Sequence, residues 1–464
     1  MYTGKLWTLY NGVFSGSRRL VINGVLKANV IRNFSSKNPK PKGRILLRSK
    51  RFLTNLGIAA VLSYTGYAVW VIGASSEEIA MRQDIVHFME EGQESNEGTL
   101  VKYSPLKVLG RFENPFDEYR IQTVQEFFFN RIVELFQRNR GGIPNNKEDM
   151  DELMPIHKPD WLQKGIRLVY EKSENKVVVS KILEGNEVQN RNIGFQGNKN
   201  IPIYTTWLGQ SCNYILYNGL KILTDPLFSD YLVDETFGPK RITEQPCQID
   251  EVPEPDVIVV SHNHPDHLDA ASIEKWRNTD VLWIVPKGMS HYLKRFDVSN
   301  FIELSWWETC ELEKGNEIYH ISCTPAMHWS GRGLTDINHS LWCSFLLSHN
   351  NEPILFHAGD TGYVSDLYSR IKRKFGSGCR LAILPCGQYC PEWHQKPRHI
   401  DPSEVIKIME DLEAKHVLGV HWGTFVLSGE YFREPKERLE LLAEWKGIKD
   451  NCHCPELGKT EHIK

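Results

Sequence analysis

A tight cluster of metal-ligand side chains constrains this chain more than any other feature. His262, His264, Asp266 and His267 fall within six positions, directly after the apolar run Val257–Val260. That run predicts a buried strand, and the polar cluster predicts a strand-to-helix turn where side chains converge. Imidazole and carboxylate groups suit zinc, iron or manganese. A lone buried histidine is usually structural, but this spacing predicts a metal site.

Three further segments place a histidine or an aspartate where an apolar run stops. They are Thr324–Trp329 with His328, Ala358–Gly362 with Asp360, and Val420–Gly423 with His421. With the cluster they supply five imidazoles and two carboxylates, enough for two metal ions. Two ions about 3.5–4 Å apart can polarise a phosphoryl oxygen and supply a hydroxide. The sequence therefore predicts a two-metal hydrolase.

Short apolar runs rich in β-branched and aromatic residues predict many strands from about residue 201 onward. The runs are Ile203–Leu208, Tyr214–Tyr217, Ile222–Leu223, Val257–Val260, Leu282–Val285, Ile318–Cys323, Ser344–Leu347, Ile354–Phe356, Leu381–Leu384 and Val417–Val420. Helical patterns follow late, at Pro402–Lys415 and Glu434–Trp445. This order favours an α+β fold in which packed sheets are flanked by helices.

The N-terminus has the composition of a targeting segment. The first 76 residues hold 12 Lys or Arg and no acid, which leaves 43 basic against 58 acidic residues in the rest. Such a basic, Ser-rich start is typical of mitochondrial transit peptides. Arg32-Asn33-Phe34-Ser35 resembles a site of the matrix processing peptidase, so we expect a transit peptide at 1–34 and a basic segment at 35–51. A disordered basic tail on a cytosolic protein is the alternative.

The 23 residues Phe52–Ala74 carry no charge. About 20 apolar residues are enough to cross a bilayer, so 52–74 is predicted to be a transmembrane helix rather than a buried core helix. Basic residues precede this segment and Glu77-Glu78 follows it, which keeps the N-terminus in the matrix. We therefore expect a single-pass protein of the mitochondrial inner membrane whose body faces the intermembrane space.

Three features of the body do not by themselves identify a function. An apolar stripe over 115–140 predicts a helix, either packed on the core or resting on a membrane surface. Residues 174–200 are polar, with a short apolar run at Val177–Val179, and suggest a hairpin plus loop. The ten cysteines between 212 and 454 form no CxxC pattern, so unpaired buried thiols are expected.

The short sequence motifs around the histidine cluster resemble those of a known family. They are Trp207–Gly209, Leu223–Phe228, Gly238–Arg241, Thr324–Trp329, Ala358–Tyr363, His399–Pro402 and Val420–Phe425, with Gly110–Pro115 upstream. The cluster resembles the metal-binding motif of the metallo-β-lactamase superfamily, and the other motifs resemble those of N-acyl-phosphatidylethanolamine-hydrolysing phospholipase D. The resemblance covers roughly 108–445. It implies an αββα sandwich with an extension at 75–200, a catalytic domain at 201–450 and a tail at 451–464.

The resemblance also implies roles for individual residues. His262, His264 and His328 would bind one metal ion, Asp266, His267 and His421 would bind the second, and Asp360 would bridge both. Asp266, Asp360 and His399 would be catalytic, with His399 near the phosphate; a surface histidine in a Pro-flanked loop is the alternative. Asp225 is the candidate carboxylate that orients a ligand, or else a turn residue before Pro226.

Departures from the family pattern mark where substrate choice is open. Gln210 follows Gly209 where many superfamily members have Gly-His, so a titrating group is replaced by a hydrogen-bonding one. The segments Pro385–Cys390 and Trp393–Arg398 are only loosely similar. The resemblance implies two divalent ions, with zinc favoured, and hydrolysis of a membrane phospholipid to phosphatidic acid and N-acylethanolamine.

Two other functions fit the sequence less well. A phosphodiesterase on nucleic acid conflicts with the acidic body, so no nucleic-acid partner is expected. A non-catalytic organiser of the inner membrane conflicts with the retention of all seven ligand-type positions. A homodimer is left open as an alternative to a monomer.

Overall fold

The computed structural model describes residues 42–90, 102–120, 126, 129, 140–162, 176–184, 201–236, 238–333, 336–376 and 378–464. The predicted transit peptide at 1–34, the start of the basic segment 35–51 and most of the predicted helix 115–140 lie outside these residues. The chain divides into two units, 1–66 and 67–464, and each is described by itself.

One long helix, α2 (Lys42–Glu90), contains the predicted transmembrane segment 52–74. Its part Lys50–Asp84 is long and apolar enough to cross a membrane, with a mean hydropathy of 1.6, and its apolar window is not buried. Val61 is 65% exposed and Trp70 is 58% exposed. Exposed large apolar side chains along such a helix fit a lipid environment by length and composition.

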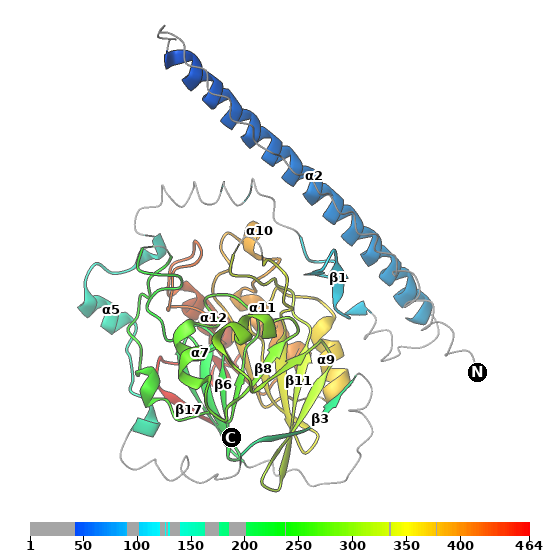
Figure 1. The fold of residues 1–464 in the computed structure, drawn as a ribbon. Coiled ribbons are helices and arrows are strands. Elements are labelled where there is room, and N and C mark those ends of the chain that lie inside the picture. The colour runs from blue at the N-terminus through cyan, green and yellow to red at the C-terminus, as the bar shows by residue number, and fades with distance from the viewer. Residues whose placement is uncertain are drawn as a thin grey trace. The chain divides into compact units, whose positions relative to one another are not determined.

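The strands that the structure describes from residue 178 onward form two packed sheets (Figure 1). The seven-stranded sheet has the order β17 (Thr460–Ile463), β4 (Ile203–Gly209), β5 (Cys212–Tyr217), β6 (Leu220–Thr224), β7 (Val257–Val259), β8 (Leu282–Pro286) and β9 (Phe301–Leu304). The eight-stranded sheet has the order β16 (Cys452–His453), β15 (His416–Val420), β14 (Leu381–Pro385), β13 (Glu352–His357), β12 (Ser344–His349), β11 (Glu317–Thr324), β10 (Thr309–Lys314) and β3 (Val178–Leu183). All ten predicted strand runs are confirmed, and both predicted late helices form.

The helices cover the outer faces of the two sheets. Along β7, Val257 and Val259 point into the core between the sheets, whereas Ile258 packs with a second cluster that includes Ile273 and Trp276 of α7 (Ala270–Trp276). Strands buried on both faces read as continuous apolar runs, which is why these strands were visible in the sequence. Helices α9 (Leu367–Phe375), α11 (Pro402–Leu412) and α12 (Glu434–Trp445) belong with the eight-stranded sheet.

The shorter elements belong to neither of the two large sheets. They are β1 (Leu106–Val108), β2 (Arg111–Glu113), α5 (Lys147–Leu153), α8 (Ser290–Leu293), α10 (Glu392–Gln395) and the short helices η1 (Arg140–Gly142), η2 (Asp160–Leu162), η4 (Ile249–Glu251) and η5 (Lys294–Phe296). All ten cysteines are free, and only Cys390 is not fully buried.

Parallel pairing gathers the strand ends that matter for function. β6, β7, β8 and β9 are parallel to one another, as are β13, β14, β15 and β16. β11 and β13 are both antiparallel to β12, so β11 runs the same way as β13. The loops that follow β6, β7, β11, β13, β14 and β15 can therefore meet at one rim of the sandwich.

The segment 451–464, set apart as a tail from the sequence, contributes a strand to each sheet. β16 pairs with β15, and β17 pairs with β4, where Thr206 and Thr460 hydroxyls lie 2.7 Å apart. Gly458 N donates to Trp207 O at 2.9 Å. These strands are short and mostly polar in sequence, so no apolar pattern announces them.

The close packing of this segment can be tested with two glycines in the left-handed region. A Cβ on Gly458 (φ +81) would lie 1.9 Å from His157 O, whereas a Cβ on Gly447 (φ +71) meets nothing within 4 Å. Left-handed strain costs each alanine variant roughly 1–2 kcal/mol, and overpacking adds about 1–3 kcal/mol at 458 only. We expect Gly458→Ala to lower the Tm, followed by tryptophan fluorescence, clearly more than Gly447→Ala. Equal shifts would contradict the packing.

Candidate metal centre

The predicted ligands sit on four loops at the rim where parallel strands end. His262, His264, Asp266 and His267 follow β7 and precede α7. The loop is closed by Asp269, which caps α7 by accepting from Ser272 N at 2.7 Å and also accepts from Ser229 N at 2.6 Å. His328 follows β11, Asp360 follows β13 and His421 follows β15 directly. The two sheets thus contribute to one place.

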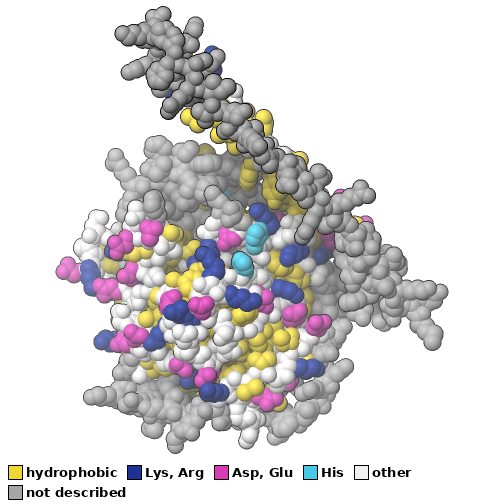
Figure 2. Space-filling view, in the orientation of Figure 1, with side chains coloured by type: hydrophobic (Ala, Val, Ile, Leu, Met, Phe, Trp, Pro, Cys, Tyr) yellow, Lys and Arg dark blue, Asp and Glu magenta, His cyan; other side chains and the backbone are white. Residues whose placement is uncertain are grey.

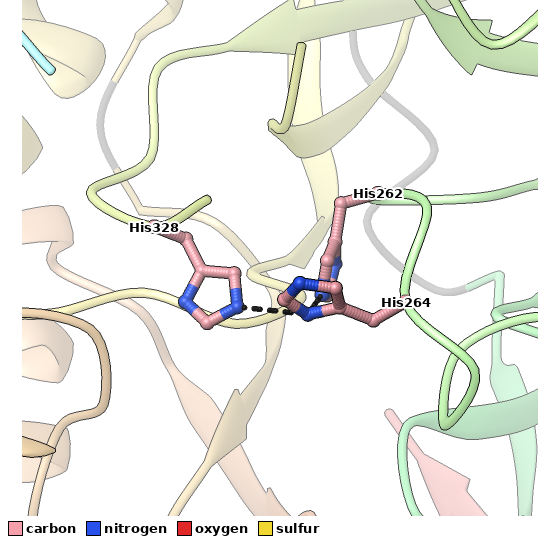
Figure 3. Close-up of side chains that lie close together, drawn as sticks. All are labelled: His262, His264 and His328. Atoms are coloured by element: carbon pink, nitrogen blue, oxygen red, sulfur yellow. Dashed lines mark hydrogen bonds between the residues drawn. The ribbon is translucent and has the colours of Figure 1, made fainter. Parts of the chain in front are cut away.

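His262, His264 and His328 form the first group (Figure 3). His262 Nε2 lies 2.7 Å from His264 Nδ1, and His328 Nε2 lies 3.3 Å from the same atom. All three side chains are buried, with 7% exposure at most. Three ring nitrogens pointed at one spot have little reason to meet unless a shared electron-pair acceptor can lie between them.

Asp266, His267, Asp360 and His421 form the second group. His267 Nε2 lies 3.2 Å from Asp360 Oδ2, and His421 Nε2 lies 3.0 Å from Asp360 Oδ1 and 3.4 Å from Asp266 Oδ2. Asp360 also reaches the first group, since its Oδ2 lies 3.7 Å from His328 Nε2. The Asp360 carboxylate therefore lies between the two groups.

His399 lies at the same place and forms a third group with His328 and Asp360. Its Nδ1 is 3.8 Å from Asp360 Oδ2, and the side chain is 3% exposed. The alternative of a surface histidine is therefore wrong. Burial lowers the pKa of His399 well below its ordinary value, so the ring is a neutral N–H donor at pH 7.

Asp225 lies at the end of β6 and accepts four hydrogen bonds while fully buried. The donors are Ser261 N at 2.6 Å, Ser261 Oγ at 2.8 Å, and ring nitrogens of His267 and His357, each at 2.9 Å. Burial alone would raise its pKa, but His357 and His267 outweigh this and lower it to about 2. A permanent carboxylate here fixes His267 Nδ1–H and leaves Nε2 facing the second group.

His357 is a site residue that the sequence interpretation missed. It ends β13, three positions before Asp360, and is 2% exposed. The sequence feature that could have revealed it is a histidine at a strand end, directly before the Ala358–Gly362 motif. Asn114 was also missed; its Nδ2 donates to His328 O at 2.7 Å, and His328 Nδ1 lies 3.0 Å from Arg398 O.

Gln210 stands beside the second group at the turn between β4 and β5. Its Nε2 donates to Asp266 Oδ2 at 3.0 Å and lies 2.9 Å from His421 Nε2. Its backbone N donates to Thr424 Oγ1 at 2.8 Å. The side chain therefore holds Asp266 by a hydrogen bond, lies beside the His421 ring and brings no charge to the site.

The charges of the two groups differ. Burial lowers the pKa of His264 and of His328 to about 3, so both are neutral ligands at pH 7. Burial acts in the same direction on His421, but Asp360 and Asp266 outweigh it and raise the pKa of His421 to about 9. The same carboxylates raise the pKa of His267. The second group therefore demands buried positive charge.

Divalent cations fit this donor set. Buried carboxylates need a compensating charge, and a metal ion beside them would supply it in place of the imidazole protons. Nitrogen and oxygen donors without thiolate suit zinc, iron or manganese. His262, His264 and His328 would hold one ion, Asp266, His267 and His421 a second, and Asp360 would contact both.

Arg332 braces the ligand loop from outside the two groups. Its Nε donates to Asn263 Oδ1 at 2.9 Å, and its Nη2 donates to His264 O at 3.2 Å and to Leu268 O. The guanidinium lies 4.5 Å from the centre of the Tyr292 ring. A planar fork on two carbonyls of one loop limits how far His264 and Asp266 can drift.

The fold and the site together define a metal-dependent hydrolase of the metallo-β-lactamase type. The family model for the beta-lactamase superfamily domain matches residues 221–422. The N-acyl-phosphatidylethanolamine-hydrolyzing phospholipase D, mitochondrial, of Saccharomyces cerevisiae is 61% identical over 416 residues, covering 89% of each chain. The N-acyl-phosphatidylethanolamine-hydrolyzing phospholipase D 1 of Caenorhabditis elegans is 36% identical over 258 residues, covering 53% of this chain and 72% of that one.

Among solved structures, a metallo hydrolase from Ignicoccus hospitalis aligns with a TM-score of 0.42 at 19% identity, covering 57% of this chain and 99% of that one. On the strength of the yeast and nematode relatives, this chain belongs to the N-acyl-phosphatidylethanolamine-hydrolysing phospholipase D family. The family resemblance and the metallo-β-lactamase fold expected from the sequence are confirmed.

The hydrogen bonds from Arg332 to the ligand loop allow a test of metal binding that does not depend on activity. Arg332→Met keeps much of the side-chain volume but loses every hydrogen bond to the ligand loop. We expect zinc affinity, measured by competition with a chelating dye, to fall roughly 10- to 100-fold. The control is Arg295→Met, because Arg295 lies 5.9 Å from the same Tyr292 ring. Equal zinc affinities of the two variants would contradict the role of Arg332 in holding the ligand loop, provided both metal-free proteins keep the wild-type Tm.

Proposed function

We propose that this chain is a phospholipase D that uses two divalent metal ions, with zinc favoured. Its substrate would be the headgroup phosphodiester of N-acyl-phosphatidylethanolamine or a related phospholipid, and its products phosphatidic acid and N-acylethanolamine. The observation that carries the proposal is the pair of buried ligand groups joined at Asp360. The names of the yeast and nematode relatives supply the substrate class.

Some residues would hold the metal ions, and others would take part in the reaction. Bound divalent ions would supply a hydroxide at neutral pH and polarise the phosphoryl oxygens. Asp360 spans the two groups, and Asp266 completes the second. His399 lies beside Asp360 and presents a neutral N–H, so it can donate to a phosphoryl oxygen as negative charge develops there or assist the leaving headgroup oxygen.

Residues around the ligands keep this geometry without reacting. Asp225 fixes the tautomer of His267, and Gln210 orients Asp266. These contacts are hydrogen bonds from buried groups, so they persist whether or not substrate is present. We assign both residues to positioning rather than to catalysis.

We also propose that α2 anchors the enzyme in the mitochondrial inner membrane, with the catalytic body in the intermembrane space. The apolar part of α2, the basic N-terminus and the mitochondrial relative support this. A tether keeps the site at a bilayer, where the substrate is. On the coloured part of the face in Figure 2, basic and acidic side chains are interspersed rather than gathered into a basic stripe, which suits a lipid better than a nucleic acid.

Release of phosphatidic acid from liposomes tests the activity directly. We expect metal-dependent turnover of N-acyl-phosphatidylethanolamine that falls roughly 100-fold or more in Asp266→Asn and in His328→Ala, because each change removes a ligand. The matched controls are Asp297→Asn and His291→Ala, both at exposed positions. Absence of turnover on any phospholipid would remove the proposal, and RNA cleavage lost in the same two variants would replace it with a nuclease.

Protease protection tests the orientation. With an epitope after Lys464, we expect the tag to survive protease added to intact mitochondria and to be digested once the outer membrane is ruptured. The reason is that basic residues stay on the matrix side of the span. A matrix protein and an intermembrane-space protein serve as controls, and a tag that survives in mitoplasts would reverse the orientation.

A further inference from the structure

The segment before the sandwich runs along the loop that carries His328. This segment, residues 102–120, contains β1 and β2 and is called the strap. Asn114 Nδ2 donates to His328 O at 2.7 Å, and Phe112 N donates to Asn338 O at 2.8 Å. Both acceptors belong to the loop that follows β11. The strap therefore holds this loop at two points, and one of them is a predicted metal ligand.

His328 is held both at its backbone and at its ring. Its carbonyl oxygen accepts from Asn114, and its Nδ1 lies 3.0 Å from Arg398 O, which leaves Nε2 for the first metal group. Asn114 and His328 are at most 3% exposed, so losing the amide would leave a buried carbonyl without this donor. Partners that hold a metal-ligating histidine in place commonly set the metal affinity.

The strap is packed into the body and is not a loose linker. Tyr103, Phe112 and Phe116 are each at most 5% exposed and belong to the core between the sheets. Trp307 Nε1 donates to Tyr103 O at 3.2 Å, which ties the start of the strap to the end of β9. A flexible tether is polar and makes no such contacts. The strap therefore transmits position from one end to the other.

The C-terminal part of α2 is bonded to the same strap. Arg82 Nη1 donates to Ser104 O at 2.7 Å, and its Nη2 donates to Pro105 O at 3.2 Å. Arg82 lies eight residues after Ala74, the last residue of the uncharged run, within one continuous helix. At the rise of an α-helix this is about 12 Å along the axis. The strap is thus attached to α2 close to the end of its apolar part.

We propose that the strap joins the membrane helix to the metal centre by fixed contacts. Arg82 holds one end, and Asn114 positions His328 at the other. This connection presents the metal centre to the bilayer in one orientation, which a loose linker does not do. The effect on the bilayer substrate rests on the proposed phospholipase D function, whereas the effect on metal binding does not. Both residues act through others, so we assign them to positioning.

Metal titration of the full chain tests the Asn114 end. Asn114→Leu loses the donor, and we expect one of two zinc ions to bind roughly tenfold more weakly, with a changed visible spectrum after cobalt substitution. The control is Asn300→Leu, because Asn300 Nδ2 also donates to backbone carbonyls, of Asp280 at 3.0 Å and Val281 at 3.1 Å. These residues precede β8 and β9, at the rim opposite the metal loops. Equal zinc affinities of the two variants would overturn the role of Asn114, whatever their Tm values.

Turnover by the full chain in liposomes tests the Arg82 end. We expect Arg82→Met to lower kcat/KM for N-acyl-phosphatidylethanolamine in the same bilayer roughly tenfold and to leave that for a water-soluble short-chain analogue unchanged. The control is Arg277→Met, which loses a pair with Glu274 at 3.0 Å much as Arg82→Met loses its pair with Glu78 at 3.6 Å. If Arg82→Met slows both substrates equally or neither, the link to the membrane is overturned while the phospholipase function stands. If wild-type protein hydrolyses neither substrate, the proposed function fails, and the metal titration still decides the role of Asn114.

Discussion

One buried carboxylate, Asp225, joins the two sheets at the point where the metal groups form. It sits at the end of β6 in the seven-stranded sheet and bonds His267 from the same sheet, while His357 comes from the end of β13 in the eight-stranded sheet. A buried carboxylate is stable only when its charge is compensated and its lone pairs are filled. Asp225 meets both needs with four donors, and in doing so it sets the distance between the sheet rims. The positions of His267 and Asp360, three residues beyond His357, depend on that distance.

The second consequence of this arrangement is an unequal division of charge between the two metal groups. The first group consists of three imidazoles kept neutral by burial, whereas the second contains Asp266 and shares Asp360. Without a cation, those carboxylates raise the pKa of His267 and of His421, which favours protonated imidazoles there. Gln210 suits this balance because its amide satisfies Asp266 and adds no charge. A histidine at this position would add another group that could compete for protons.

Site residues could be predicted where they lie close together in the sequence, and could not be predicted where their partners lie far away in the chain. The cluster at 262–267 follows one apolar strand, so its ligands were visible from spacing alone, and parallel strand ends then explain why His328, Asp360 and His421 join it. His357 and Arg332 escaped because their partners lie on other strands or loops, and no spacing in the chain links them. The strands of 451–464 escaped for another reason. Their pairing is through the backbone, with a mostly polar sequence, so tertiary context rather than hydrophobic pattern determines them.

Backbone conformation at the rim separates Gln388 from its neighbours. Gln210, Asp225, Gln388 and His421 all have φ between +38 and +67, and each follows the end of a strand. Non-glycine residues adopt this region at a cost, and such strain persists only where surrounding contacts compensate for it. Side-chain bonds provide the compensation for three of them: Gln210 with Asp266, Asp225 with its four donors, and His421 with Asp360. Gln388 is held only through its backbone, by Glu430, and its side-chain oxygen is left without a donor among the described residues. The strained loop after β14 is therefore held by the bond from its backbone to Glu430 and by the close approach of Gly387 to His421 O, and the Gln388 side chain takes no part in holding it.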